Sequence, residues 1–231
     1  MITGSDLKES RKAIELAEKY PGLCYATVGV HPCSAKTFDS HPGGANDLLQ
    51  KLTQLAADAK ERGLATAYGE IGLDYDRLFL SGKEQQLKYF DAQLDVAVKV
   101  QLPLFLHSRA ASEDFERLLR AKLPDLPKKG LVHSFTGTME EMEGMVALGL
   151  DIGINGCSMK TEENLEVVKA VPLERLQIET DGPWVCHSFY LYGQFTFPFL
   201  NGISLAKVNA RNVIYLIWQN ILLLPALRVI Y

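Results

Sequence analysis

The chain has 231 residues, of which 47% are apolar and 23% are charged, and its formal net charge is −4. This composition is typical of a globular protein and excludes a generally disordered or collagen-like chain. The negative net charge excludes a protein that holds nucleic acid by bulk positive charge, so a phosphate substrate would require another positive charge, such as a metal ion.

Short apolar runs alternate with segments of helical periodicity along residues 1–181. The predicted strands cover residues 23–30, 64–70, 102–107, 130–133, 150–154 and 176–180, with a strand fragment at Ile2-Thr3. Helical patterns precede the first of these strands and follow each of the first five. Ser81-x-x-Glu84 and Thr138-x-x-Glu141 are typical of capping boxes at helix starts, and Ser112 is predicted to be an N-cap.

Strands that alternate with helices favour parallel pairing, and strands of near-continuous apolar character are typical of a sheet covered on both faces. The strand count is one short of a closed eight-stranded barrel. A doubly wound open sheet is the alternative, but no Gly-x-Gly-x-x-Gly turn follows the first strand. We therefore predict an α/β fold, a (β/α)8 barrel that is incomplete because its first strand is missing.

The charge distribution indicates a boundary near Asp181. Residues 1–181 contain all 28 acidic residues, whereas residues 182–231 contain none and carry 10 of the 21 aromatic residues. We predict a barrel over residues 1–184 and an atypical apolar tail over 185–231, disordered or poorly packed. Polar residues and Pro225 interrupt the longest apolar run, 213–231. Because a membrane-spanning helix requires about 20 mostly apolar residues, we expect no membrane span.

Four polar residues follow the predicted strands at equivalent positions: Glu70, His107, His133 and Asp181. The carboxyl ends of the strands of a parallel barrel meet at one rim, where active sites are built. Two imidazoles and two carboxylates suit divalent ions such as Zn or Mn. Taken singly, each residue has a structural explanation, such as a hydrogen-bonded histidine, a turn or a loop cap. Together at equivalent strand ends, the four favour a metal site.

Five motifs stand in order along the chain: 27–32 (TVGVHP), 69–75 (GEIGLDY), 106–109 (LHSR), 132–137 (VHSFTG) and 178–181 (IETD). Over residues 1–184 the chain resembles the TatD-type metal-dependent deoxyribonucleases, particularly their eukaryotic branch. The resemblance implies a (β/α)8 barrel of the amidohydrolase type, two divalent cations (Mg, Mn or Zn), and hydrolysis of DNA phosphodiester bonds by a metal-activated water.

Residue roles follow from the same resemblance. It implies that the metal ligands are Glu70, His107, His133 and Asp181. Glu70 and Asp181 would be the catalytic residues, with Asp181 orienting or deprotonating the attacking water. Two further residues, His31 and Arg109, would lie near the substrate phosphate. A neighbouring acid, Asp74, is expected only to cap its own loop.

The chain also departs from the family pattern. The His-x-His pair of the family's first strand has no counterpart, and the last helical layer is not recognisable after Trp184. A missing strand removes several buried aliphatic side chains, each worth about 1.5–3 kcal/mol, and their sum exceeds a typical net stability. We therefore expect that this chain folds poorly or lacks activity if that strand is absent.

Three functional hypotheses remain. The first is a metal-dependent deoxyribonuclease, the second a hydrolase of amides, esters or small phosphates on the same scaffold, and the third a catalytically impaired or non-catalytic product of the family. Four dispersed cysteines without a Cys-x-x-Cys pair, and no visible secretory signal, are typical of an intracellular protein. We expect a monomer that acts on DNA in the nucleus or cytoplasm.

Overall fold

A parallel sheet forms the centre of the protein. The computed structural model describes residues 1–126, 130–182 and 228–229. The strands are β1 (Ala26–Val28), β2 (Ala65–Asp74), β3 (Leu104–Arg109), β4 (Gly130–Val132), β5 (Asp151–Ile154), β6 (Leu176–Ile178) and β7 (Arg228–Val229). Each strand pairs in parallel with the next one along the chain, so the sheet order follows the sequence order.

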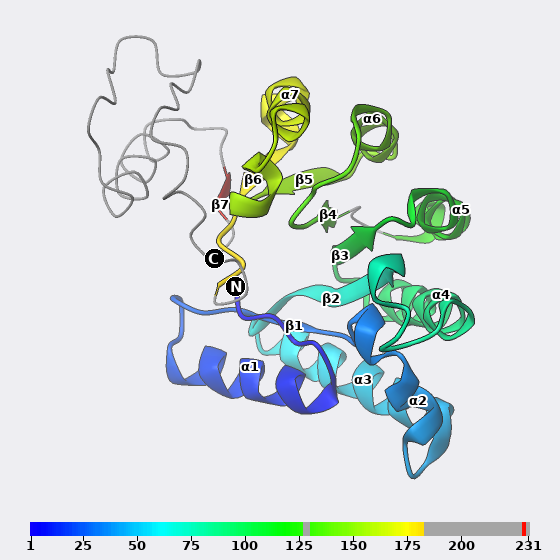
Figure 1. The fold of residues 1–231 in the computed structure, drawn as a ribbon. Coiled ribbons are helices and arrows are strands. Elements are labelled where there is room, and N and C mark those ends of the chain that lie inside the picture. Colours follow the sequence, from blue (N-terminus) through cyan, green and yellow to red (C-terminus); the bar gives the residue numbers. More distant parts are fainter. Residues whose placement is uncertain (127–129, 183–227, 230–231) are drawn as a thin grey trace.

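Helices connect these strands and cover the outer side of the curved sheet (Figure 1). They are α1 (Leu7–Lys19), α2 (Lys36–Ser40), α3 (Gly44–Glu61), α4 (Lys83–Val100), α5 (Ser112–Lys122), α6 (Met139–Ala147) and α7 (Glu162–Ala170). Short 3-10 turns lie at η1 (Pro32–Ser34), η2 (Tyr75–Arg77), η3 (Leu123–Asp125), η4 (Gly156–Met159) and η5 (Leu173–Arg175). This alternation confirms the predicted parallel α/β architecture.

The two ends of the described sheet agree only partly with the predictions. The expected strand fragment at Ile2-Thr3 is present as a single parallel bridge between Ile2 and Ala26. Arg228 and Val229, in the predicted tail, pair with Gln177 and Ile178 of β6. The predicted boundary after residue 184 and most of the apolar run 213–231 lie outside the described residues, so the predicted division into barrel and tail stays a prediction. No helix of the described residues is long and apolar enough to cross a membrane.

One of the three predicted helix starts is confirmed. At α6, the Glu141 backbone N–H donates to the Thr138 hydroxyl (3.2 Å) and the Thr138 N–H donates to the Glu141 carboxylate (2.7 Å). The N-cap prediction at Ser112 is wrong because Ala111 is the cap and Ser112 is the first helical residue.

The capping box at Ser81 is also wrong, because a tertiary contact takes its side chain. The hydroxyl donates to the carbonyl of Cys33 (3.0 Å) and accepts the backbone N–H of Lys36 (3.1 Å). Helix α4 therefore begins one residue later than that box requires, after Gly82. A side chain that caps a helix locally can equally satisfy a distant backbone group, and here the distant group is satisfied.

Alternate residues along each strand pack on opposite sides of the sheet. Leu104 and Leu106 of β3 belong to the large core beneath the helices, whereas Phe105 packs with Leu131 and Ala67 in a second, smaller cluster. Because side chains alternate with a period of two, residues 107 and 133 lie on the same side as residues 105 and 131. The alternation therefore places both histidines over the inner cluster, and the rings of Phe105 and His133 lie 4.7 Å apart.

Candidate metal centre

A bulge in β2 directs Glu70 toward the histidines. Gly69 pairs with Phe105 and Ile71 pairs with the next residue, Leu106, so Glu70 is the extra residue on its strand. Without the bulge, Ile71 would face the inner cluster, but it packs in the outer core instead. A bulge shifts the side-chain alternation by one residue and commonly re-aims a side chain beside an active site. Glu70 was predicted to end its strand, but β2 continues through the bulge to Asp74.

Gly72 allows β2 to approach β3 at the site. Its φ is +147°, and a Cβ added there would lie 1.9 Å from the backbone carbonyl oxygen of His107. Any other residue would therefore clash with the strand that carries His107. Gly72, the second glycine of the motif Gly-Glu-Ile-Gly, therefore lets the two strands lie close enough for Glu70 and His107 to meet.

Three imidazoles converge on one carboxylate oxygen. Glu70 Oε1 lies 2.6 Å from His133 Nε2, 3.0 Å from His107 Nδ1 and 3.2 Å from His31 Nε2. The two nitrogens of His107 and His133 are 3.3 Å apart. Glu70, His107 and His133 are buried. The structure therefore brings together three of the four predicted metal ligands and one of the two predicted substrate-binding residues.

A carboxylate lies behind each of two rings, on the side away from Glu70. Asp74 Oδ2 is 3.3 Å from His107 Nε2, and Glu179 Oε2 is 3.7 Å from His133 Nδ1. Glu179 also accepts the backbone N–H of Ser134, which fixes it beside β4. Only the Asp74–His107 pair is within hydrogen-bond distance, and His133 Nδ1 has no hydrogen-bond partner among the described residues. A carboxylate bonded to an imidazole in this way orients a metal-binding ring and selects its tautomer.

The expected role of Asp74 as a local cap is therefore wrong: its side chain makes no cap hydrogen bond, is 1% exposed and contacts His107. Neither Asp74 nor Glu179 was predicted as a site residue. The one sequence signal is position, since each lies within a few residues of a predicted ligand, Glu70 or Asp181, in the same motif.

The ring of His31 is held differently from the rings of His107 and His133. Its Nδ1 accepts the backbone N–H of Cys33 at 3.1 Å. With Nδ1 acting as an acceptor, a neutral His31 carries its proton on Nε2, the atom that faces Glu70 at 3.2 Å. This tautomer is assigned from the hydrogen-bond network. His31 is thus set to donate a hydrogen bond rather than to offer a lone pair.

The donor set fits a divalent cation. If Asp74 and Glu179 hold the protons of their partner rings, His107 Nδ1 and His133 Nε2 both direct lone pairs at the Glu70 oxygen. Such a set repels itself unless a proton or a cation lies within it. Mixed imidazole and carboxylate donors suit Zn, Mn and similar ions. Donor atoms of His31, Glu70 and His107 also lie within 4.8 Å of one another, and His31 could join them as a ligand only with its Nε2 unprotonated.

Without a cation, the charges of the cluster shift its pKa values strongly. Burial raises the pKa of Glu70, but His133 and His31 lower it by more, so the pKa lies well below its ordinary value. Burial lowers the pKa of His133, but Glu70 and Glu179 raise it by more, so this pKa lies well above its ordinary value. Positive charge is therefore strongly favoured at this point of the barrel rim.

Asp181 lies beside the cluster without touching it. It follows β6 with φ +49°, and burial, then the charge of Glu70, raises the pKa of its carboxyl group while His133 opposes the shift. Among the described residues, no hydrogen bond or ion pair joins Asp181 to the other predicted ligands. Arg109 pairs in register with Asp74 across β2 and β3. Burial raises the pKa of Asp74, but His107 and then the charge of Arg109 lower it, so this pKa lies below its ordinary value.

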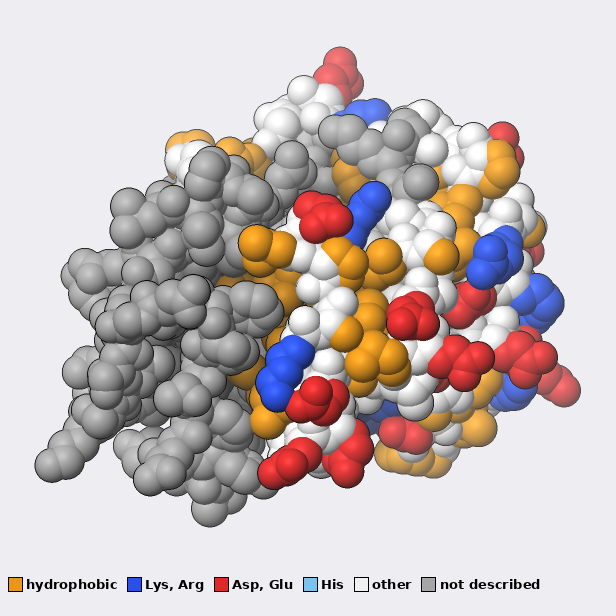
Figure 2. All heavy atoms as spheres, turned by 90° about the horizontal axis from the view of Figure 1, so that it is seen from above, with side chains coloured by type: hydrophobic (Ala, Val, Ile, Leu, Met, Phe, Trp, Pro, Cys, Tyr) orange, Lys and Arg blue, Asp and Glu red, His pale blue; other side chains and the backbone are white. Residues whose placement is uncertain are grey.

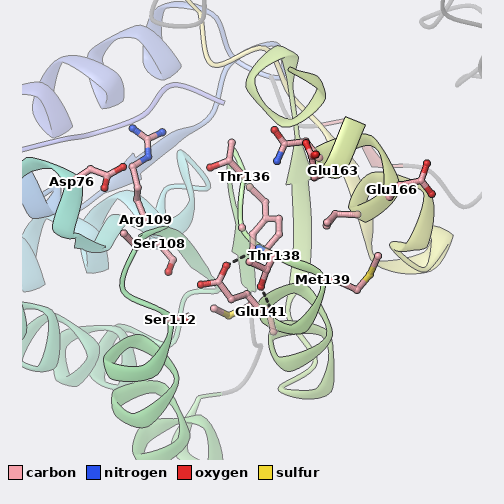
Figure 3. A pocket seen from close by; sticks show the side chains of 16 residues that line it. Asp76, Ser108, Arg109, Ser112, Thr136, Thr138, Met139, Glu141, Glu163 and Glu166 are labelled. Carbon is pink, nitrogen blue, oxygen red and sulfur yellow. Dashed lines mark hydrogen bonds between the residues drawn. The ribbon is translucent and has the colours of Figure 1, made fainter. Parts of the chain in front are cut away.

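A cavity of about 670 Å³ lies where β3 and β4 lead into their loops, and none of the predicted metal ligands lines it. Arg109 and Asp76 lie on one side of it, and Thr136 and Glu163 lie across from them (Figure 3). Its walls follow the metal-site residues directly in sequence, since Ser108 comes after His107 and Phe135 comes two residues after His133.

One face of the molecule shows how charged side chains are distributed over the described residues. On the face shown in Figure 2, the acidic and basic side chains of the described residues are interspersed and form no continuous basic stripe.

Comparison with known proteins agrees with this geometry. Residues 1–198 match the family model described as "TatD related DNase". The chain is 55% identical over 185 residues to "Deoxyribonuclease Tat-D" of Schizosaccharomyces pombe, covering 80% of this chain and 59% of that protein. It is 42% identical over 188 residues to "3'-5' ssDNA/RNA exonuclease TatD" of a Pantoea species, covering 80% of this chain and 68% of that protein.

Solved structures show the same fold. A hydrolase TatD family protein from Entamoeba histolytica is 34% identical with a TM-score of 0.70, covering 90% of this chain and 68% of that one. An uncharacterized amidohydrolase from Saccharomyces cerevisiae is 37% identical with a TM-score of 0.71, covering 79% of this chain and 63% of that one. The chain thus has the α/β barrel fold of the amidohydrolase type, spans 59% of the length of the fission yeast relative, and belongs to the TatD-related DNase family.

Proposed function

We propose that the protein is a metal-dependent nuclease that hydrolyses phosphodiester bonds of DNA with water. The observation that carries the proposal is the convergence of His107 and His133 on Glu70, each ring backed by a carboxylate. The names of two relatives, a deoxyribonuclease and a single-stranded DNA/RNA exonuclease, support the choice of substrate.

We assign Glu70, His107, His133 and Asp181 as the ligands of two divalent cations, Mg, Mn or Zn. The contacts of the first three and the charge coupling of Asp181 to the cluster support this set. Divalent ions supply Lewis-acid stabilisation of phosphate charge and make water more acidic. They also provide the positive charge that a chain of net charge −4 lacks.

The remaining roles belong to side chains at the same rim. Asp181 orients the attacking water and takes its proton, as the matched motif implies. His31 donates its Nε2–H to an oxygen of the substrate phosphate, because Cys33 occupies Nδ1. Arg109 contacts the phosphate from the cavity that it lines. Asp74 and Glu179 hold the two metal-binding rings in their working tautomers.

The experiment compares wild-type protein with Glu70→Ala and Asp181→Asn on labelled single-stranded DNA, with Mg²⁺ or Mn²⁺ added. Both variants are expected to lose cleavage, because removal of a metal ligand or of the base eliminates the activated water. The matched control is Glu84→Gln, an exposed carboxylate in the first turn of α4. Undiminished cleavage by either site variant contradicts the assigned roles.

The same experiment separates the alternative functions. Hydrolysis of small esters or phosphates without cleavage of DNA would identify another hydrolase on this scaffold. Substoichiometric metal in the purified protein, together with no turnover of either substrate, would identify a non-catalytic member of the family. The expected monomeric state and nuclear or cytoplasmic location stay predictions.

A further inference from the structure

The loop between β2 and α4 presents an exposed aromatic side chain at the rim of the metal centre. Phe79 is 82% exposed and Leu78 is 40% exposed. The loop follows the carboxyl end of β2, the strand that carries Glu70 and Asp74, so it lies on the catalytic face of the barrel. Single exposed apolar residues are common, so exposure alone implies nothing. The contacts of the loop around Phe79 are therefore the evidence for a role.

Hydrogen bonds clamp both ends of this loop. The side chain of Gln86, in α4, accepts the backbone N–H of Asp74 (2.8 Å) and donates to the carbonyls of Asp74 and Ser81 (2.9 Å each). The Ser81 hydroxyl in turn donates to the carbonyl of Cys33 (3.0 Å). Because both ends are held by buried groups, the loop holds Phe79 in a defined position outside the core.

The middle of the loop is held as well. The Tyr75 hydroxyl donates to Asp114 (2.8 Å), and the Lys83 ammonium lies 4.6 Å from the centre of the Tyr75 ring. The loop also turns back on itself through a hydrogen bond from the Leu80 N–H to the Arg77 carbonyl (2.9 Å). The ring at position 75 is therefore anchored to the protein, whereas the ring at position 79 is presented to solvent.

A cationic side chain on the same loop as Phe79 lies near the metal centre. Arg77, two residues earlier, is half exposed, and its Nε lies 3.9 Å from Asp74 Oδ2. The same oxygen of Asp74 lies 3.3 Å from His107. One loop therefore carries an exposed aromatic ring and, two residues before it, a guanidinium group that reaches the carboxylate beside His107.

We infer that Phe79 is a stacking platform for an unpaired base of single-stranded nucleic acid whose backbone runs past Arg77 into the metal centre. Proteins that bind single strands combine aromatic side chains that stack on bases with cations that follow the backbone. A protein partner is a poorer occupant, because Phe79 and Leu78 provide far less than the roughly 800 Å² that each partner of a stable complex buries. This inference rests on the proposed nuclease function.

The test measures binding and cleavage of a single-stranded oligonucleotide by wild-type protein, Phe79→Ala and Phe79→Trp. A second oligonucleotide of the same length is abasic at every position, so that it keeps the phosphates and loses the bases. Leu23→Ala is the matched control, because Leu23 is 75% exposed but lies in the turn before β1, at the opposite end of the barrel. Binding is measured by fluorescence anisotropy with Ca²⁺, and cleavage with Mn²⁺.

Phe79→Ala is expected to weaken binding of the base-bearing strand about 5- to 150-fold, the range for loss of one base stacked on an aromatic ring, and to leave binding of the abasic strand unchanged. Phe79→Trp and Leu23→Ala are expected to bind as wild type does. Equal binding of the base-bearing strand by Phe79→Ala and wild type overturns the inference, as does an equal loss on both oligonucleotides. Failure of wild type itself to cleave DNA with any added metal would instead overturn the proposed function.

Discussion

Replacement of Asp74 by Asn tests whether the carboxylate behind His107 supports metal binding. Asp74 Oδ2 lies 3.3 Å from His107 Nε2, and the side chain is 1% exposed. Asn has nearly the same shape and still offers a carbonyl oxygen, so the substitution removes the negative charge with little loss of volume. The backbone bonds of residue 74 to Gln86 are kept.

The expected loss of metal affinity follows from the position of the Asp74 carboxylate behind His107. A carboxylate hydrogen-bonded to a ligating imidazole makes the ring a better donor, and loss of such a partner typically weakens metal binding about 10- to 100-fold. That range corresponds to about 1.4–2.7 kcal/mol at 25 °C. The whole effect is expected in the binding of Mn²⁺ or Zn²⁺, because His107 itself remains in place.

The assay is isothermal titration of chelator-treated protein with Mn²⁺, beside thermal unfolding in EDTA. Asp125→Asn is the matched control, because Asp125 is exposed and lies in η3, after α5. An unchanged dissociation constant for Asp74→Asn would refute the carboxylate–histidine reasoning. A fall in the unfolding temperature in EDTA as large as that in Mn²⁺ would show that Asp74 serves the fold rather than the metal.

Two further predictions concern stability. Gly72→Ala is expected to lower the free energy of unfolding more than Gly63→Ala, measured by urea denaturation: both glycines have positive φ, but only at Gly72 does an added Cβ meet a backbone oxygen (1.9 Å). Equal losses would contradict the close approach of β2 and β3. Chelator-treated protein is expected to lose stability as pH rises above about 6.5, the ordinary pKa of histidine. The pKa of His133 is higher in the folded protein than in the unfolded chain, so its protonation stabilises the fold. This stabilisation is complete below the pKa of the unfolded chain and is lost as pH rises through the pKa of the folded protein. The same decline in His133→Asn would show that another group causes it.

Local and periodic patterns in the sequence predicted the corresponding parts of the structure correctly. Alternation of apolar strands with helices predicted the parallel α/β barrel, since each strand and helix is determined mainly by its own pattern. The rule that parallel strands end at one rim then predicted that Glu70, His107, His133 and Asp181 would meet. The structure brings the first three within 2.6–3.3 Å of one another, whereas no hydrogen bond or ion pair of the described residues joins Asp181 to them. The Thr138 capping box was also confirmed, because it involves only groups three residues apart.

Only the tertiary structure decided the finer arrangement of the site. Glu70 faces the histidines because the register of β2 against β3 inserts one residue, and register is a property of the pair of strands. The partners of His107 and His133, Asp74 and Glu179, come from strands or loops far along the chain, so no local pattern identifies them. Ser81 was lost as a helix cap for the same reason, since a distant carbonyl competes for its hydroxyl. The sequence by itself determined which chemical groups reach the rim, and the three-dimensional pairing of strands determined which atom of each group faces which neighbour.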